Sequence, residues 1–369
     1  MSVVINGTNG VTYNDGSLQS SAPTVGKNRI INGDMRIHQR GGTITMSTGN
    51  YNLDRFFSYT STDGAQTAEQ STETPVGFKN SLKVTTTTAD ASIAAGQRTS
   101  IIHRVEGNNI SDLDWGTSDA KTVTLSFWVR SSITGTHGGA VGNGSDNRAY
   151  PFTYAISSAD TWEKKTITIP GDTTGTWATD NGRSLQIAWG LGVGTTYSGT
   201  AGAWESADRN SATGATTGVI GTLNATWFLT GVQLEIGTTA SNFENLQFGQ
   251  QLTLCQRYYE VIVDGSDGIG LQVIGIAGLT YKVDQINMPI NFKTEKRANS
   301  STLEFVSGAY YEMRTHTTTV TTSSMGVTGG QTGKQNAVPY FNTSGQTEHQ
   351  SWTFYVQNSA AHMAFSSEL

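Results

Sequence analysis

Two pairs of carboxylates are the side chains in this sequence that come closest to a catalytic arrangement. Asp112 and Asp114 stand in SDLDW, and Asp264 and Asp267 stand in DGSDG. Cleavage of a glycosidic bond needs two carboxyls held on either side of that bond, and spacing along the chain does not establish such a geometry. Acidic residues in short motifs of this kind are more often turn residues or calcium ligands. We therefore predict that the chain is not an enzyme.

The other reactive side chains do not form a catalytic or metal-binding set. The segment GGAVGNGSDN is rich in glycine but lacks the lysine that would bind a phosphate. The single cysteine, Cys255, lies on the apolar side of a short helical pattern, so it is predicted to be a buried structural thiol and excludes an intramolecular disulfide. No two histidines stand at a metal-ligand spacing, and the six are His38, His103, His137, His316, His349 and His362.

Aromatic side chains on polar strand faces are better candidates for function. In TVTLSFWVR, Trp128 and Arg130 lie on the polar side of the alternation, and in TWFLTGVQLEIG, Trp227 and Gln233 lie on the outward side. An exposed indole offers a flat apolar surface to the C–H face of a sugar ring, while neighbouring polar groups bind its hydroxyls. We predict these four residues as glycan-binding candidates. The alternative is that the indoles pack under a loop or in a subunit interface.

A structural calcium ion is a further hypothesis, and the sequence indicates no other cofactor. Jelly-roll modules often tie their first and last strands together with such an ion. Asp34 and Glu235 lie on the corresponding strands and carry the oxygen ligands that Ca²⁺ prefers.

The charge of the chain argues against nucleic acid as a partner. The net charge is −6, whereas nonspecific binding of nucleic acid depends on a dense positive field. The stretch KNRIINGDMRIHQRGG (27–42) is locally basic, and a local polyanion-binding patch is the alternative there. Its alternation predicts a strand with charges on the open face, in which the apolar residues are Ile31, Met35 and Ile37 and the polar residues are Asp34, Arg36, His38 and Arg40.

The composition predicts an all-β protein. Glycine is very frequent with 43 residues, charged residues make up only 14%, and short alternating segments are separated by polar turns. Strands with one polar face and long loops favour an antiparallel sandwich or jelly roll. Three strands are predicted to bury, in order along the chain, Val123, Leu125, Phe127 and Val129; Leu185, Ile187, Trp189 and Leu191; and Phe228, Val232, Leu234 and Ile236.

The chain divides into four predicted segments, and its length fits two or three domains. Residues 1–26 are too poor in large apolar side chains for a core of their own, so they are expected to gain order by pairing with other chains or docking on a partner; the alternative is a flexible tail. Residues 27–247 form the jelly-roll sandwich, and 248–258 form a short helical connector. Residues 259–369 form a smaller C-terminal β-sandwich, which is the candidate receptor-binding domain at the far end of the molecule.

The sequence also bears on location. The first residues lack the basic-then-apolar pattern of a signal peptide, and no apolar stretch is long enough to cross a membrane. Together with the single cysteine, this predicts a soluble protein made in a reducing cytoplasm, without membrane insertion.

Several motifs taken in order resemble a family of bacteriophage tail-fibre and virion proteins. They are KNRIINGDMRIHQRGG with YNLDRF, then SFWVRSS, WFLTGVQLEIGTTASNFE and LCQRYYEV, and they cover roughly 28 to 260. The N-terminal INGTNGVTYNDGSLQSSA is similar to a stretch found near the start of many phage fibres. MPINFKTEKRANSSTLEF is a looser match to the C-terminal domains, because the proline usual after the arginine is absent.

The resemblance implies a fold, partners and a location. It implies a jelly-roll domain like that of carbohydrate-binding modules, a homotrimer, attachment to phage tail or virion proteins through residues 1–26, and a place in the virion after synthesis in the host cytoplasm. No catalytic residues come with this family.

Three functions remain in competition at this stage. The first is a tail fibre that recognises a bacterial surface glycan or protein without catalysis. The second is a purely structural spacer, adaptor or head-decorating fibre. The third is a tailspike that degrades a glycan, which would require two carboxylates facing each other in a cleft.

Overall fold

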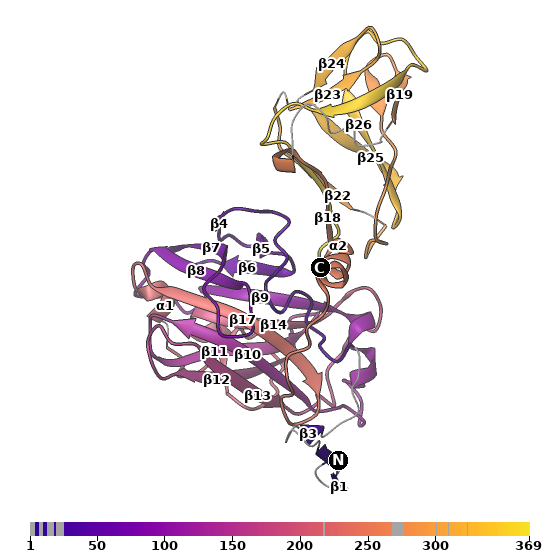
Figure 1. Ribbon diagram of the computed structural model, residues 1–369. Helices are drawn as coiled ribbons and strands as arrows, with labels where there is room; N and C mark the ends of the chain where they lie inside the picture. The colour runs from indigo at the N-terminus through magenta and orange to yellow at the C-terminus, as the bar shows by residue number, and fades with distance from the viewer. Residues whose placement is uncertain are drawn as a thin grey trace.

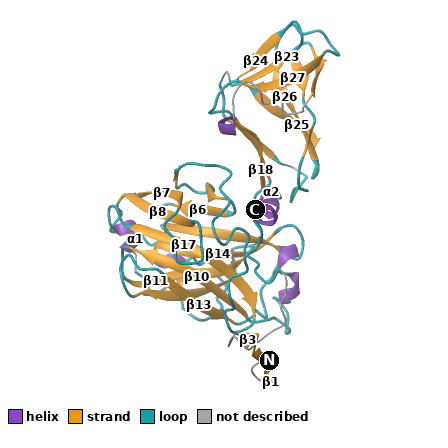
Figure 2. Cartoon of the chain, viewed as in Figure 1, coloured by secondary structure: helices purple, strands orange, loops and turns teal. Residues whose placement is uncertain are grey.

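The chain folds into a central β-sandwich and a C-terminal β-domain that projects from it (Figure 1). This computed structural model describes residues 26–216, 218–267, 277–299, 301–308, 310–322 and 324–369, together with short strands at 4–6, 10–12 and 18–19. Strands dominate both bodies and the helices are short (Figure 2), which confirms the predicted all-β class. Across the described ranges, no helix is long and apolar enough to span a membrane.

Two six-stranded sheets face each other in the central sandwich. In spatial order, the first sheet contains β13 (Glu163–Ile169), β10 (Val123–Ser131), β17 (Thr226–Ile236), β8 (Ser81–Thr88), β7 (Ala65–Ser71) and β4 (Ile44–Thr45). The second contains β12 (Ala149–Ile156), β11 (Gly135–Asn143), β14 (Arg183–Val193), β9 (Arg98–Glu106), β6 (Phe56–Thr60) and β5 (Tyr51–Leu53). All the pairings within these two sheets are antiparallel, as the half-polar strands predict.

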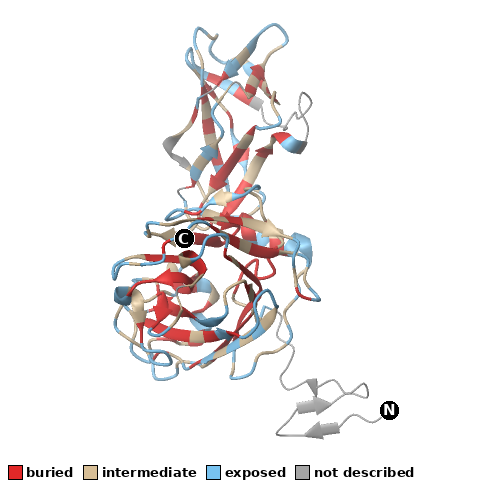
Figure 3. Ribbon diagram, turned by 90° about the vertical axis from the view of Figure 1, so that its left-hand side faces the viewer, coloured by how far each residue is buried: buried red, intermediate tan, exposed pale blue. Residues whose placement is uncertain are grey.

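The core lies between the two sheets, where Figure 3 shows the buried residues gathered. Successive side chains of a strand point to opposite faces, so every second residue of β10 and β14 enters this layer. Phe127 of β10 and Trp189 of β14 meet edge to face, with ring centroids 5.8 Å apart. The predicted inward residues of both strands are fully or almost fully buried: Val123, Leu125, Phe127, Val129, Leu185, Ile187, Trp189 and Leu191.

Short elements complete the central body. The segment after β14 lies over the second sheet, where β16 contacts β11, β12 and β14. The short elements of the central body are η1 (Gly107–Asn109), η2 (Ser111–Leu113), η3 (Thr195–Tyr197), β15 (Ser198–Gly199), β16 (Ser211–Ala212) and α1 (Gly218–Gly221). Before the sandwich, β1 (Val4–Asn6), β2 (Gly10–Thr12) and β3 (Leu18–Gln19) form a small antiparallel sheet.

The basic stretch at 27–42 is not a strand, and that prediction was wrong. Asn32 and Met35 adopt left-handed backbone conformations, with φ of 61° and 58°, which break an extended run. The buried Asn32 side chain explains the turn, because its amide donates to the carbonyls of Ile37 and Asp54 at 2.8 and 3.0 Å while its oxygen accepts from the Ile37 N–H at 2.9 Å.

This stretch packs closely against β17. The Val232 N–H donates to the carbonyl of Gly33 at 2.9 Å, and a β-carbon placed on Gly33 would lie only 2.1 Å from the Val232 oxygen. A side chain therefore does not fit at this position. The apolar residues of the stretch point inward as predicted: Met35 joins the main core, and Ile31 and Ile37 pack beside Cys255 and Tyr258.

The C-terminal domain begins with helix α2 (Phe248–Gln256), whose first turn is closed by reciprocal hydrogen bonds between Gln247 and Gln250. After helix α2 comes a three-stranded sheet of β18 (Tyr259–Asp264), β28 (His362–Ser366) and β22 (Thr302–Phe305), which stands next to a larger sheet. The larger sheet and the turn after β18 consist of η4 (Gly265–Asp267), β19 (Ala277–Lys282), β20 (Gln285–Asn287), β21 (Ile290–Asn291), β23 (Tyr311–Arg314), β24 (Thr319–Thr322), β25 (Met325–Thr332), β26 (Asn336–Asn342) and β27 (Ser351–Val356).

A second core fills the space between these two sheets. Val263, Met363 and Phe365 from the three-stranded sheet pack with residues of the larger sheet such as Trp352 and Phe354. The predicted alternation of Ile286, Met288, Ile290 and Phe292 is confirmed, since the first three are buried and the fourth packs against the same cluster.

Candidate functional site

A β-bulge in β17 overturns the predicted exposure of Trp227. Ser126 pairs with Gln233 but Trp128 pairs with Thr230, so two residues of β17 face the single residue Phe127 of β10. Gly231 is one of the two and has φ of 60°. The extra residue reverses the alternation on the N-terminal side of the bulge.

The reversal sends Trp227 into the core and Phe228 to the opposite face. The Trp227 side chain is 0% exposed and belongs to the main core cluster. Ile236, which was expected to be inward, is 43% exposed at the end of the strand. The sequence interpretation assumed an unbroken alternation, which a single inserted residue defeats.

The three other glycan-binding candidates do not form an open site. Trp128 is half-buried and lies beside Gly231. Gln233 lies on the outward side of β17 as predicted, but it is 0% exposed because the segment at 241–244 covers it: its amide donates to Glu235 at 2.7 Å and its oxygen accepts from the Glu244 N–H at 2.8 Å.

Arg130 is also already engaged. Its guanidinium lies over the Phe228 ring with 4.9 Å to the centroid, pairs with Glu73, and donates to the Asp160 carbonyl at 2.9 Å. The structure thus brings Trp128 and Arg130 to the same face, as predicted, but these partners hold the guanidinium in place.

The two calcium candidates have separate partners. Asp34 is buried and forms an ion pair with Arg36; burial raises the pKa of the Asp34 carboxyl more than Arg36 lowers it. Both oxygens of Glu235 accept hydrogen bonds from Ser241, at 2.8 Å from the N–H and 2.6 Å from the hydroxyl. In the part of the chain that the structure describes, no three His, Cys, Asp or Glu side chains gather as a metal site. The calcium site stays a prediction.

The carboxylates of the two acidic motifs lie in turns. Asp112 forms an ion pair with Arg29 at 2.6 Å. Asp114 has a left-handed backbone conformation and forms an ion pair with Lys121 at 2.9 Å. Asp264 accepts hydrogen bonds from the N–H and hydroxyl of Ser266, two residues further along. The Asp264 contacts are typical of a turn residue, the interpretation that the sequence favoured, whereas Asp112 is bound by an ion pair with a distant segment.

Cys255 is fully buried, as predicted, and burial raises the pKa of its thiol well above the ordinary value. A thiol in this state is not a reactive nucleophile.

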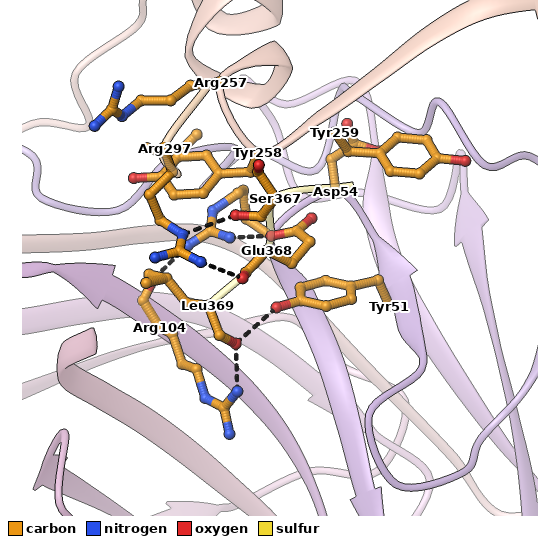
Figure 4. A network of polar contacts seen from close by, with 12 residues as sticks. Tyr51, Asp54, Arg104, Arg257, Tyr258, Tyr259, Arg297, Ser367, Glu368 and Leu369 are labelled. Carbon is orange, nitrogen blue, oxygen red and sulfur yellow. Dashed lines mark hydrogen bonds and ion pairs between the residues drawn. The ribbon is translucent and has the colours of Figure 1, made fainter. Parts of the chain in front are cut away.

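A dense polar network joins the two bodies, and Figure 4 shows it from close by. Glu106 at the end of β9 is 1% exposed and accepts two hydrogen bonds from Arg257, at 3.0 and 2.6 Å, and one from the Tyr258 hydroxyl at 2.7 Å. Burial, the largest single influence, raises the pKa of Glu106, but the hydrogen bonds from Arg257, Tyr258 and Asn108 together outweigh it, so the pKa is lowered.

Residues 367–369 extend this network onto the sandwich. The Glu368 carboxylate pairs with Arg55, and Arg40 stands 3.5 Å from it. These three side chains are 7%, 1% and 12% exposed. The main-chain oxygen of Leu369 accepts from the Tyr51 hydroxyl at 3.2 Å and from Arg104.

Arg297 reaches the same segment from the C-terminal domain. It donates to the carbonyls of Ser367 and Glu368 at 2.7 and 2.9 Å and to that of Asn181 at 3.1 Å. Asn181 returns a bond to the Arg297 carbonyl at 2.7 Å. The charged groups here bind carboxylates or main-chain oxygens of the protein itself, so we assign this network to holding the two bodies together and not to chemistry.

The basic stretch of the sequence contributes to this junction. The Arg40 guanidinium lies 3.6 Å from the centroid of the Tyr259 ring, and Gln39 donates to the Tyr259 carbonyl at 2.8 Å. Arg36 donates to the Leu246 carbonyl at 2.7 Å. Its cations are thus bound within the molecule, which explains why this stretch is not an open patch for a polyanion.

A hollow on the outer face of the larger C-terminal sheet is the open candidate site. Strand β27 alternates strictly: Trp352, Phe354 and Val356 enter the core, whereas Ser351, Thr353 and Tyr355 face outward. Opposite it, β23 places Arg314 beside Thr353 and Glu312 beside Tyr355. The hollow has a volume of about 420 Å³, within the range of small-molecule sites, and is lined by Arg314, Thr315, His316, Ser351, Trp352, Thr353 and Tyr355.

The ion pair between Arg314 and Glu312 fixes the aromatic ring of Tyr355 at the hollow. Arg314 lies over Tyr355, with 4.4 Å from the guanidinium carbon to the ring centroid. Glu312 binds the same guanidinium at 2.8 and 2.7 Å and accepts from Gln357 at 3.0 Å. Arg314 therefore fixes the ring by covering one of its faces, which leaves only the other face for a ligand, and its positive charge is paired.

Hydroxyl groups of Thr315, Ser351 and Thr353 line the hollow together with His316 and Trp352. Thr315 closes the turn between β23 and β24, because its N–H donates to the Thr318 carbonyl at 2.8 Å and its hydroxyl accepts from the Thr318 N–H at 2.9 Å. A fixed aromatic ring with hydroxyls around it can bind the C–H face and hydroxyls of a sugar. The alternation of SWTFYV in the sequence indicates this outer face. The predicted glycan-binding residues were chosen around tryptophans and therefore did not include Tyr355.

No protein-family model and no curated protein matches this sequence. Solved structures resemble just over half of this chain at low similarity. They include a family 11 carbohydrate-binding module from Clostridium thermocellum in complex with a β-1,3-1,4-mixed-linked tetrasaccharide (12% identity, 54% of this chain and 98% of that one, TM-score 0.27). The CBM22-1 xylan-binding domain of Paenibacillus barcinonensis Xyn10C is also similar (14% identity, 54% and 97%, TM-score 0.27).

A third similar structure is the enzymatically active domain of tailspike protein 4 from bacteriophage CBA120, with 12% identity and a TM-score of 0.30. The match covers 57% of this chain but only 22% of the tailspike chain.

Proposed function

We propose that this chain is a non-catalytic glycan-binding fibre protein of a bacteriophage virion, and that it binds through the hollow around Tyr355. The observation that carries the proposal is the fixed Tyr355 ring with its hydroxyl rim, on the body that projects from the central sandwich. The ordered motifs that resemble phage fibre proteins support the virion role.

The remaining parts of the proposal follow from that resemblance. Residues 1–26 would attach the protein to the phage tail or another virion protein, and three copies would associate. A homotrimer would give three hollows, so even a modest affinity at each would bind a cell surface firmly by multivalency.

A direct test is the binding of fluorescently labelled full-length protein to a panel of bacterial strains. We expect saturable binding to at least one strain. Periodate oxidation of the cells should abolish it and protease treatment should not, since periodate destroys sugars. The opposite pattern would identify a protein receptor. Light scattering on the same sample counts the subunits.

Two variants link the binding to the hollow. Tyr355→Ala removes the ring and should abolish cell binding, whereas Tyr355→Phe keeps the ring and should retain it. Tyr197→Ala is a matched control, because it removes a half-buried tyrosine that also lies under an arginine, Arg98, but in the central sandwich.

A purely structural role as a spacer, adaptor or head-decorating fibre is the second candidate. The network around Glu368 favours it, because rigid coupling of two bodies is what a spacer requires. A folded protein that binds none of the strains would support this role and refute the first.

A further inference from the structure

The binding face continues beyond the hollow. Leu279 and Tyr281 of β19 are 47% and 60% exposed. Thr280 between them is buried and accepts a hydrogen bond from the Trp352 indole at 2.7 Å, so it points into the core. Leu279 pairs directly with Ser351, which places Leu279 on the same outer face as Thr353 and Tyr355. Tyr281 is the extra residue of a β-bulge, since Thr280 pairs with Ile286 and Lys282 with Gln285. Its side chain stays on the exposed side, because Thr280 before it points into the core.

The two tyrosines stand at opposite ends of this strip. Ser351 lies four residues before Tyr355, and Tyr281 lies two residues past Leu279 in the same direction along the strands. Six residues at about 3.3 Å each separate the two rings by roughly 20 Å along the strand axis. A single sugar stacked on one ring would not reach the other.

The side chains between the rings are uncharged hydroxyl and aliphatic groups. Ser351 and Thr353 offer hydroxyls, and Leu279 offers apolar surface. At the hollow, Glu312 already pairs with Arg314, so that guanidinium gives little extra attraction to an acidic sugar. At the other ring, Lys282 Nζ lies 5.6 Å from the Tyr281 centroid, so tighter binding of an acidic sugar than of a neutral one would contradict an uncharged ligand.

We propose that the ligand is an extended, uncharged polysaccharide strand that lies along β27 from Tyr355 to Tyr281, and not a single terminal sugar. This inference rests on the proposed function and names the ligand class of the same site. Both rings contribute only when one ligand spans them, because the second contact is then intramolecular.

The test measures the affinity of the full chain for uncharged oligosaccharide ladders, from one to eight units, of α-1,4-glucan, β-1,4-glucan, β-1,4-xylan and α-1,6-mannan. We expect at least one ladder to bind, with an affinity that rises with chain length until both rings are spanned. An oligogalacturonide ladder is the acidic comparison and should bind no more tightly.

Variants separate the two ends of the site. Tyr281→Ala should weaken binding of the long oligosaccharides about 3- to 10-fold, as expected for one aromatic contact, and leave the shortest ones unchanged. Tyr355→Ala should weaken all of them. Val283→Ala is the control, because it removes an exposed side chain just past the end of β19, 53% exposed, and should change nothing.

The inference is overturned if no neutral ladder binds, if the acidic ladder binds more tightly, if affinity does not depend on length, or if Tyr281→Ala has no effect. A protein that binds cells through Tyr355 while failing these tests would leave the proposed function intact. If Tyr281→Ala instead reduces the number of subunits, the strip is an interface between copies of the chain, and the inference also fails.

Discussion

Glu368→Gln tests whether the polar junction couples the two bodies. The substitution keeps the shape of the side chain and removes its charge. Arg55, which is 1% exposed, would then remain buried without its carboxylate partner. Removing one partner of a buried ion pair costs about 3–5 kcal/mol, because the other charge is left uncompensated in a poorly solvated place.

The matched control is Glu295→Gln. Glu295 stands 3.6 Å from Lys334, and the two side chains are 51% and 39% exposed. An exposed pair of this kind contributes about 0–1 kcal/mol, so this variant should unfold like the parent protein.

Urea denaturation of the full chain, followed by intrinsic fluorescence and far-UV circular dichroism, measures both effects. We expect Glu368→Gln to lower the free energy of unfolding by about 3–5 kcal/mol. Limited proteolysis should then release the C-terminal domain. Unfolding curves that match for Glu368→Gln and Glu295→Gln would refute the argument that this pair holds the junction.

Three further predictions concern the sandwich. Trp227→Ala should lose about 3–5 kcal/mol of unfolding free energy in urea by leaving a cavity, and the half-buried Trp128→Ala only about 1 kcal/mol; equal losses would contradict the bulge. Gly231→Ala should cost about 1–3 kcal/mol by the same assay, because alanine disfavours its positive φ and its β-carbon would lie 2.6 Å from the Phe78 ring. Burial, and secondarily Arg40, lowers the pKa of His38 from 6.5 to about 4. As the pH drops from about 6.5 to 4, the unfolded chain binds this proton before the folded chain does, so the stability of the fold falls in that window. His38→Gln should flatten that part of a stability–pH profile.

The sequence predicted the fold where a strand alternates without interruption. Val123 to Val129 and Leu185 to Leu191 point inward as expected, because burial of one face imposes a period of two on each strand. Prediction failed where one residue breaks that period. Gly231 lies in the bulge of β17, and a glycine inside an alternating segment is a sequence signal for such a bulge.

The candidate site was harder to predict, because exposure depends on contacts between distant segments. The cations of the basic stretch find partners such as Glu368, Tyr259 and Leu246, hundreds of residues away. Tyr355 matters because β23 brings Arg314 over its ring. Alternation shows which face of a strand is polar, but not whether another segment covers that face.

The way the C-terminal domain is attached has a mechanical consequence. It leaves the sandwich through β18 and returns through β28, and these strands pair antiparallel from Tyr259 with Ser366 to Asp264 with His362. A pull at the far end would therefore load two anchored strands in parallel, with Glu368 securing the second. The tension would be shared between β18, which continues from the sandwich, and β28, which Glu368 ties to Arg55 of the sandwich. Two anchored strands would let the far end resist twisting as well as bending.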